Sequence, residues 1–122
     1  MRFPPDTVDF IPFDAVDFPP RAGYNHIRNG GDDMTRWHVV FTGRVQHVGF
    51  RYTAFYFSRD LYLTGWVDNG PDGSVEMEVQ GGPLQLQELL SRLKGRFDID
   101  RVEVTKIDPV PHERGFRVRG YR

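Results

Sequence analysis

The chain has 122 residues, of which 39% are hydrophobic and 14% aromatic, and its formal net charge at pH 7 is −1. This composition predicts one compact domain and provides no overall basic field for nucleic acid or an anionic membrane. The absence of cysteine excludes disulfides, cysteine zinc sites and thiol catalysis. No apolar run has the length of a signal-peptide core or a membrane span, so we expect a cytoplasmic protein.

Residues 1–33 differ in composition from the rest of the chain. They contain five of the nine prolines and carry six Asp against three Arg, and so many prolines interrupt long helices and central strands. Residues 28–33 are typical of a flexible linker, and Met34 after them could be an alternative translation start. We expect a poorly ordered extension at 1–33 and a folded domain at 34–122. The alternative is that Phe side chains of the extension dock on the domain.

From Trp37 onward the pattern is regular and predicts five strands and two helices. The strands are expected at residues 37–43, 64–68, 74–80, 101–108 and 115–121. The helices are expected at residues 52–63 and from Pro83 to a cap at Gly95. The clearest periodicity is the alternation that places Val75, Met77 and Val79 on one face of their strand.

The order of these elements is β-α-β-β-α-β followed by a short terminal strand. Two βαβ halves of this kind build an α+β, ferredoxin-like sandwich, whose antiparallel sheet carries both helices on one face. Many activities share this fold, so the fold alone does not identify the function. RNA-recognition modules share it too, but the strand at 74–80 carries acids where they need bases and aromatics. No nucleic-acid partner is therefore expected.

The segment GRVQHVGFR at residues 43–51 joins the first strand to the first helix and suits an anion. Its two glycines and the helix N-terminus allow unpaired backbone N–H groups to point outward together. Arg51 stands at the first helical turn, where a cation opposes the helix dipole unless an anion normally sits there. Its planar fork of donors matches phosphate. The alternative is an arginine that points into solvent or pairs with Asp60 or Asp98.

Asn69 has a structural interpretation of its own. Asn before Gly is a favoured dipeptide of tight turns, and Pro71 and Gly73 extend the turn signal. By residue type alone, Asn69 is therefore more typical of a turn than of an active site.

Taken together, these segments resemble a known family. The segment at 43–51 resembles the first signature of the acylphosphatases through Gly43, Val45, Gln46, Val48, Phe50 and Arg51. The segment GWVDNGPDGSVEMEVQG at 65–81 resembles the second signature, glycine for glycine. The resemblance covers about residues 36–122 and leaves the extension outside.

The resemblance implies hydrolysis of the carboxyl–phosphate bond of acyl phosphates to carboxylate and inorganic phosphate. It implies a phosphate-binding loop of backbone amides, with Arg51 binding the phosphoryl oxygens and Asn69 holding the attacking water. The loop residues are Gln46, His47, Val48, Gly49, Phe50 and Arg51. We expect a monomer that acts on a small-molecule acyl phosphate, with inorganic phosphate or sulfate as competitive ligand.

No metal or organic cofactor is expected. The carboxylate product is a good leaving group, and a loose phosphoryl-transfer transition state needs positioning and charge stabilisation more than covalent chemistry. His26, His38 and His112 are scattered, with no two at metal-ligand spacing on one element.

Two residues depart from the family pattern. His47 stands where the family usually has glycine, which suggests that this position needs an unusual backbone angle or a close approach to phosphate. Asp68 places a negative charge beside Asn69, and we interpret it as a solvated residue at a strand end. The substitution at His47 motivates an alternative function, a degenerate member that binds a phosphorylated ligand or partner without turnover.

Overall fold

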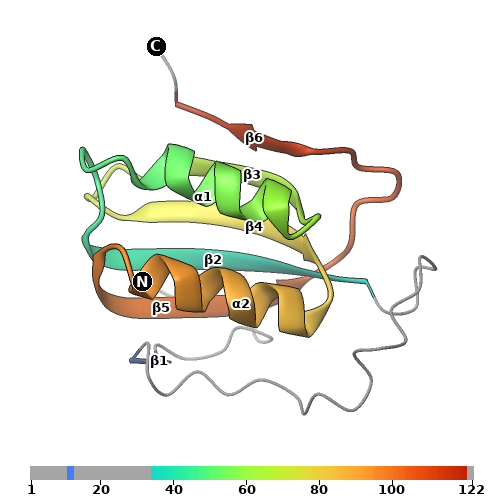
Figure 1. Ribbon diagram of the computed structural model, residues 1–122, viewed down its shortest axis with the longest axis horizontal. Coiled ribbons are helices and arrows are strands. Elements are labelled where there is room, and N and C mark those ends of the chain that lie inside the picture. The colour runs from blue at the N-terminus through green and yellow to red at the C-terminus, as the bar shows by residue number, and fades with distance from the viewer. Residues whose placement is uncertain (1–10, 13–33, 121–122) are drawn as a thin grey trace.

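A computed structural model describes residues 11–12 and 34–120 (Figure 1). The expectation of poor order for residues 1–33 lies almost wholly outside these described residues. The strands are β1 (Ile11–Pro12), β2 (Thr35–Arg44), β3 (Thr64–Asn69), β4 (Val75–Gly81), β5 (Asp98–Ile107) and β6 (Phe116–Val118). The helices are α1 (Phe50–Asp60) and α2 (Pro83–Lys94). All seven elements predicted from Trp37 onward are present, with shifted ends.

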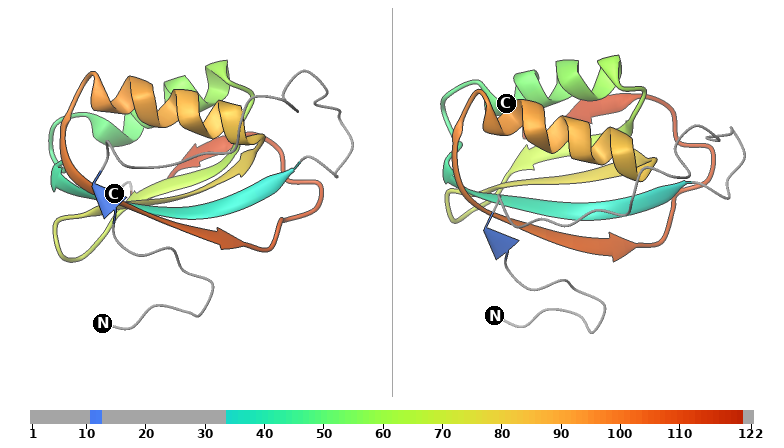
Figure 2. Two further views of the ribbon diagram at one scale, coloured as in Figure 1. Left: turned by 90° about the horizontal axis from the view of Figure 1, so that it is seen from below. Right: turned by 60° about the horizontal axis from the view of Figure 1, so that its bottom comes forward.

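The sheet has the order β1-β5-β2-β4-β3-β6, and both helices cover one of its faces (Figure 2). The four central strands pair antiparallel, as the ferredoxin-like prediction requires. The terminal strand β6 is different, because it crosses to the far edge and pairs parallel to β3. The predicted antiparallel sheet is therefore confirmed for the central strands, and the parallel pairing of the short terminal strand makes the whole sheet mixed.

The core lies between the helices and the sheet. The predicted alternation in β4 is confirmed, since Val75, Met77 and Val79 are fully buried. Opposite them, α2 buries one row of leucines: Leu86, Leu89, Leu90 and Leu93. Burying such side chains stabilises the fold by roughly 1.5–3 kcal/mol each. The core thus fixes the helices on the sheet and makes their ends a firm support for a site.

Helix α1 begins two residues before its predicted start and ends three residues before its predicted end. It starts at Phe50 because Gly49, at φ 85°, adopts the left-handed conformation and serves as the N-cap. It stops at Asp60 because Tyr62 is also left-handed, at φ 60°, and the Leu63 amide turns back to the Ser58 carbonyl. Arg51 is consequently the second residue of the helix.

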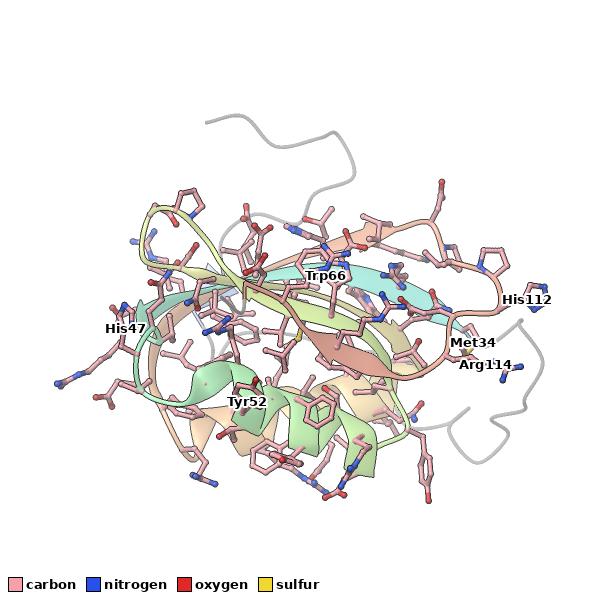
Figure 3. All side chains as sticks on the ribbon, turned by 90° about the horizontal axis from the view of Figure 1, so that it is seen from above. Met34, His47, Tyr52, Trp66, His112 and Arg114 are labelled. Carbon is pink, nitrogen blue, oxygen red and sulfur yellow. The ribbon has the colours of Figure 1, made fainter. Side chains whose placement is uncertain are left out.

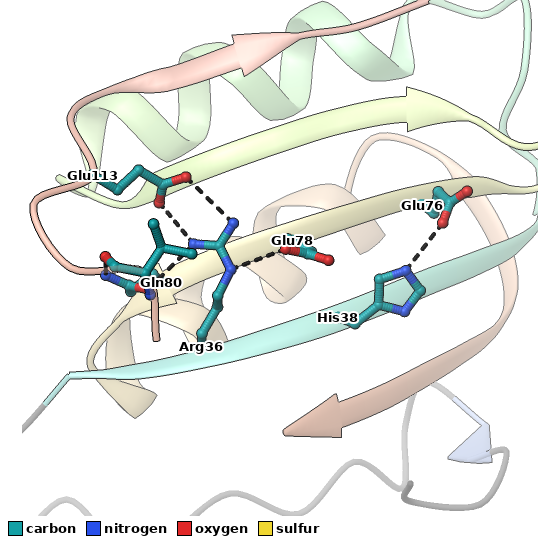
Figure 4. A network of polar contacts seen from close by, with 7 residues as sticks. Arg36, His38, Glu76, Glu78, Gln80 and Glu113 are labelled. Atoms are coloured by element: carbon teal, nitrogen blue, oxygen red, sulfur yellow. Dashed lines mark hydrogen bonds and ion pairs between the residues drawn. The ribbon is translucent and has the colours of Figure 1, made fainter. Parts of the chain in front are cut away.

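A buried arginine fixes the connection that leads from β5 to β6 (Figure 4). The Arg36 side chain is only 2% exposed, and it donates hydrogen bonds to Glu78 (3.0 Å), Gln80 (3.2 Å) and Glu113 (2.8 Å). A buried guanidinium needs such partners, because an unpaired charge there is costly. Gln80 also holds both backbone groups of Val110. This network anchors the chain segment that brings β6 to the edge of the sheet.

Candidate active site

The loop between β2 and α1 is tied directly to the β3–β4 hairpin. Val45 is buried at the start of this loop, and the Gln46 Nε2 atom donates to the carbonyl oxygens of Gly70 (2.8 Å) and Ser74 (2.7 Å). Sequence reasoning placed Gln46 in the loop but missed this role for its side chain. No local signal could have revealed it, because the partners are 24 and 28 residues away.

The middle of the loop has the backbone geometry of an anion site. His47 (φ 62°) and Gly49 (φ 85°) are left-handed and flank Val48, which is not. Alternation of left-handed and right-handed residues is typical of a nest, in which successive N–H groups converge on an anion. His47, Val48 and Gly49 are exposed, and His47 lies at the outer tip of the loop (Figure 3). The predicted unusual backbone angle at position 47 is confirmed.

Arg51 binds a backbone carbonyl in the described part of the chain. Its Nη1 atom donates to the Arg119 carbonyl oxygen at 2.5 Å, and the Arg119 amide donates to the Val67 carbonyl oxygen at 2.8 Å. The predicted alternative partner Asp60 lies instead 3.7 Å from Arg92. The segment after β6 therefore links the start of α1 to the end of β3 and holds the Arg51 guanidinium there.

Asn69 is the last residue of β3 and pairs with Val75 across the sheet. The turn itself follows it, closed by the Gly70 amide on the Ser74 carbonyl at 2.8 Å. The interpretation of Asn69 as a turn residue is therefore wrong. Asn69 is two residues beyond the core residue Val67, so its side chain stands on the helix-covered face.

Two anchors tie the chain on either side of Asn69 to the loop and to the start of α1. Gln46 holds Gly70, the residue after Asn69, and Arg51 reaches Val67 through Arg119. Asn69 lies in the chain between the two held residues. The fold thus brings the loop, Arg51 and Asn69 to one end of the sheet.

Asp68 is partly buried rather than solvated, which corrects the sequence-based interpretation. Its carboxylate lies against Gly120 so closely that a Cβ atom at that position would overlap Oδ1. The same Cβ would stand 3.1 Å from Arg51 Nη1. The neighbouring Arg119 guanidinium stacks 4.2 Å above the ring of Trp66, which Figure 3 places on β3. Glycine at 120 therefore leaves room for the terminal segment to pass beside Arg51.

Comparison with known proteins shows the family. The family model named Acylphosphatase matches residues 37–118. The chain belongs to the acylphosphatase family. An acylphosphatase of Geobacillus thermodenitrificans is 40% identical over 88 residues, which are 70% of this chain and 94% of that protein.

Solved acylphosphatases have the same fold. The structure from Coxiella burnetii is 30% identical with a TM-score of 0.67, and the match covers 76% of this chain and 100% of that one. The structure from Bacillus subtilis is 30% identical with a TM-score of 0.64, covering 69% and 97%. These matches confirm the family and the ferredoxin-like fold predicted from the two signatures.

The described residues form neither a metal-ligand cluster nor a membrane-spanning helix. In residues 34–120, no three His, Asp or Glu side chains gather in the way that metal ligands do. Within the same part of the chain, neither helix is long and apolar enough to cross a membrane.

Proposed function

We propose that this acylphosphatase cleaves the carboxyl–phosphate bond of acyl phosphates with Arg51 and Asn69 as its working side chains. Membership of the family supports the reaction, and one structural observation supports the residues. The bonds from Gln46 and Arg51 join the loop and the start of α1 to the chain on both sides of Asn69. We infer that a group bound in the loop lies close to both the Arg51 guanidinium and the Asn69 side chain.

The phosphoryl group would be held by the backbone N–H groups of residues 46–51 and by the guanidinium. Arg51 uses Nη1 for the Arg119 carbonyl, which orients the fork and leaves Nε and Nη2 to bind phosphoryl oxygens. These donors stabilise the charge on the equatorial oxygens as the phosphoryl group passes from the leaving carboxylate to the attacking water.

Asn69 would position the attacking water in line with the bond that breaks. The leaving carboxylate has a pKa of about 4, so it departs without a general acid. A phosphoryl oxygen can accept the proton of the water, so the reaction needs no histidine or carboxylate base. Positioning and electrostatic stabilisation together then account for the catalysis.

Binding without turnover is the alternative function, and His47 is the residue that motivates it. His47 adopts the left-handed conformation that glycine adopts more easily, so the loop keeps its nest geometry despite the side chain. The loop geometry suits both functions, and membership of the acylphosphatase family is what favours turnover.

Hydrolysis of benzoyl phosphate by the purified protein is the deciding experiment. Arg51→Ala should nearly abolish turnover and weaken inhibition by phosphate. Arg51→Lys should not restore it, because a point charge lacks the fork. A lysine variant with nearly wild-type turnover would refute the bidentate role.

Asn69→Ala tests the second side chain. It should lower kcat and leave the inhibition constant for phosphate nearly unchanged, because Asn69 holds water and not the anion. Loss of both, together with a lower melting temperature, would show that Asn69 serves only to support the hairpin.

The family match covers residues 37–118, and we propose that residues 34–122 form an independent domain. We further propose that the protein acts as a cytoplasmic monomer on small acyl phosphates, with inorganic phosphate or sulfate as competitors. Sedimentation at working concentration tests the monomer.

A further inference from the structure

Exposed apolar side chains border the loop on its outer side. Val48 is 41% exposed in the loop, and Tyr52 is 45% exposed in the first turn of α1. Val48 precedes Arg51 by three residues, and Tyr52 directly follows it. Tyr56, 52% exposed, continues the row one turn further along α1. Single exposed apolar residues need no explanation, but a contiguous row beside a charged site often marks a binding surface.

The proposed reaction determines where the acyl group must lie. In an in-line displacement, the attacking water and the leaving oxygen stand on opposite sides of phosphorus. Asn69 would hold the water at the end of β3, on the side of the loop that Gln46 ties to the hairpin. The leaving carboxylate and its substituent therefore point away from β3, toward the exposed side of the loop. Figure 3 shows Tyr52 on α1, directly after that loop.

We propose that Tyr52, together with Val48, contacts the acyl group and makes the enzyme favour substrates with an aromatic or bulky apolar acyl group. This inference rests on the proposed function. The phosphoryl half of the substrate is bound by amides and Arg51, and these contacts are the same for every acyl phosphate. Selectivity among substrates must come from side chains on the leaving-group side. The Tyr52 ring can stack on an aromatic acyl group, whereas an acetyl group is too small to cover it.

A different role for the pair is purely structural. Val48 precedes the N-cap Gly49, and an apolar residue at that position can pack on the first turns of its helix. In that case Tyr52 would contribute to stability and would not distinguish one substrate from another.

The test compares benzoyl phosphate with acetyl phosphate for the wild type and three variants. Tyr52→Ala should lower kcat/KM for benzoyl phosphate about five-fold to ten-fold, mainly through KM, and for acetyl phosphate less than about two-fold. Inhibition by inorganic phosphate should not change. Tyr52→Phe should behave like the wild type, because the ring and not the hydroxyl makes the contact. Tyr62→Ala is the matched control, since Tyr62 is 87% exposed beyond the opposite end of α1.

Three results would overturn the inference. The first is an equal loss on both substrates. The second is a drop in melting temperature that accounts for the loss in activity. The third is Tyr62→Ala with the same selectivity change as Tyr52→Ala. Turnover of acetyl phosphate in any of these cases would leave the proposed function standing, whereas a wild type that hydrolyses neither substrate would overturn both.

Discussion

Gln46→Ala isolates the contact that joins the loop to the hairpin. The variant loses two neutral hydrogen bonds, to the carbonyl oxygens of Gly70 and Ser74. At a net value of about 1 kcal/mol each, the free energy of unfolding should fall by about 2 kcal/mol. For a domain of this size, each kcal/mol lowers the melting temperature by roughly 4–8 °C, so the variant should melt about 10 °C lower. Circular dichroism measures this directly.

The same variant should lose more in turnover than in anion binding. The backbone amides and Arg51 remain, so the inhibition constant for phosphate should change only about two-fold to three-fold, within the range of one weak contact. Asn69 would no longer be held beside the loop, and a misplacement of about 1 Å can cost about 100-fold in rate. We therefore expect kcat for benzoyl phosphate to fall about 10-fold to 100-fold.

Asp72→Ala is the matched control in the same hairpin. The Asp72 carboxylate accepts hydrogen bonds from the Ser74 amide (3.2 Å) and hydroxyl (2.6 Å), and these bonds lie within the hairpin, not between it and the loop. Its replacement should leave kcat within about two-fold of the wild type, as expected for a surface change. The reasoning fails if Asp72→Ala lowers kcat as much as Gln46→Ala, or if Gln46→Ala melts like the wild type.

Three further predictions concern other parts of the chain. His47 is held at φ 62°, where glycine is less strained, so His47→Gly should not lower kcat for benzoyl phosphate or weaken inhibition by sulfate; a marked loss of either would show that the imidazole contributes to the site. Burial raises the pKa of Glu113, but hydrogen bonding to Arg36 and nearby guanidinium charges lower it below its ordinary value. The ionised Glu113 carboxylate therefore stabilises the fold above the unfolded pKa of about 4.3, and this contribution is lost as pH falls through the folded pKa. Acidification should therefore lower the free energy of unfolding less in Glu113→Gln than in the wild type, as measured by urea unfolding. A chain of residues 34–122 should melt cooperatively and hydrolyse benzoyl phosphate, and failure to fold would place the domain boundary before Met34.

The sequence predicted the elements whose signals are local. Alternation identified β4, and Pro83 and Gly95 marked both ends of α2 correctly. The end of α1 was wrong because Leu61 and Tyr62 continue the apolar pattern, although the backbone has already turned at Tyr62.

The pairing of strands depends on residues that are distant in sequence, so it could be predicted only in part. Strand β5 begins at Asp98, not Arg101, because the β2–β5 ladder shifts register between Thr42 and Gly43, leaves Asp100 of β5 as an extra residue, and then continues to Asp98. The three residues of β6 carry no local signal that predicts its parallel pairing with β3. The candidate site follows the same rule. Arg51 and Asn69 could be named from their signatures, whereas the bonds that hold Gln46 and Arg51 depend on hairpin and terminal carbonyls far along the chain.

Strand β5 also bears on whether copies of this protein pair edge to edge. It forms a ten-residue strand near the edge of the sheet, and among the described residues β1 pairs with it at Val102 and Arg101. Pro12 in β1 has no N–H group to extend that ladder. The remaining edge carries exposed charges at Asp98, Asp100 and Lys106, which oppose the approach of a second strand. We therefore expect the protein to remain soluble at high concentration while these residues are charged. Their replacement by neutral residues would favour aggregation through edge-to-edge pairing of β5 strands.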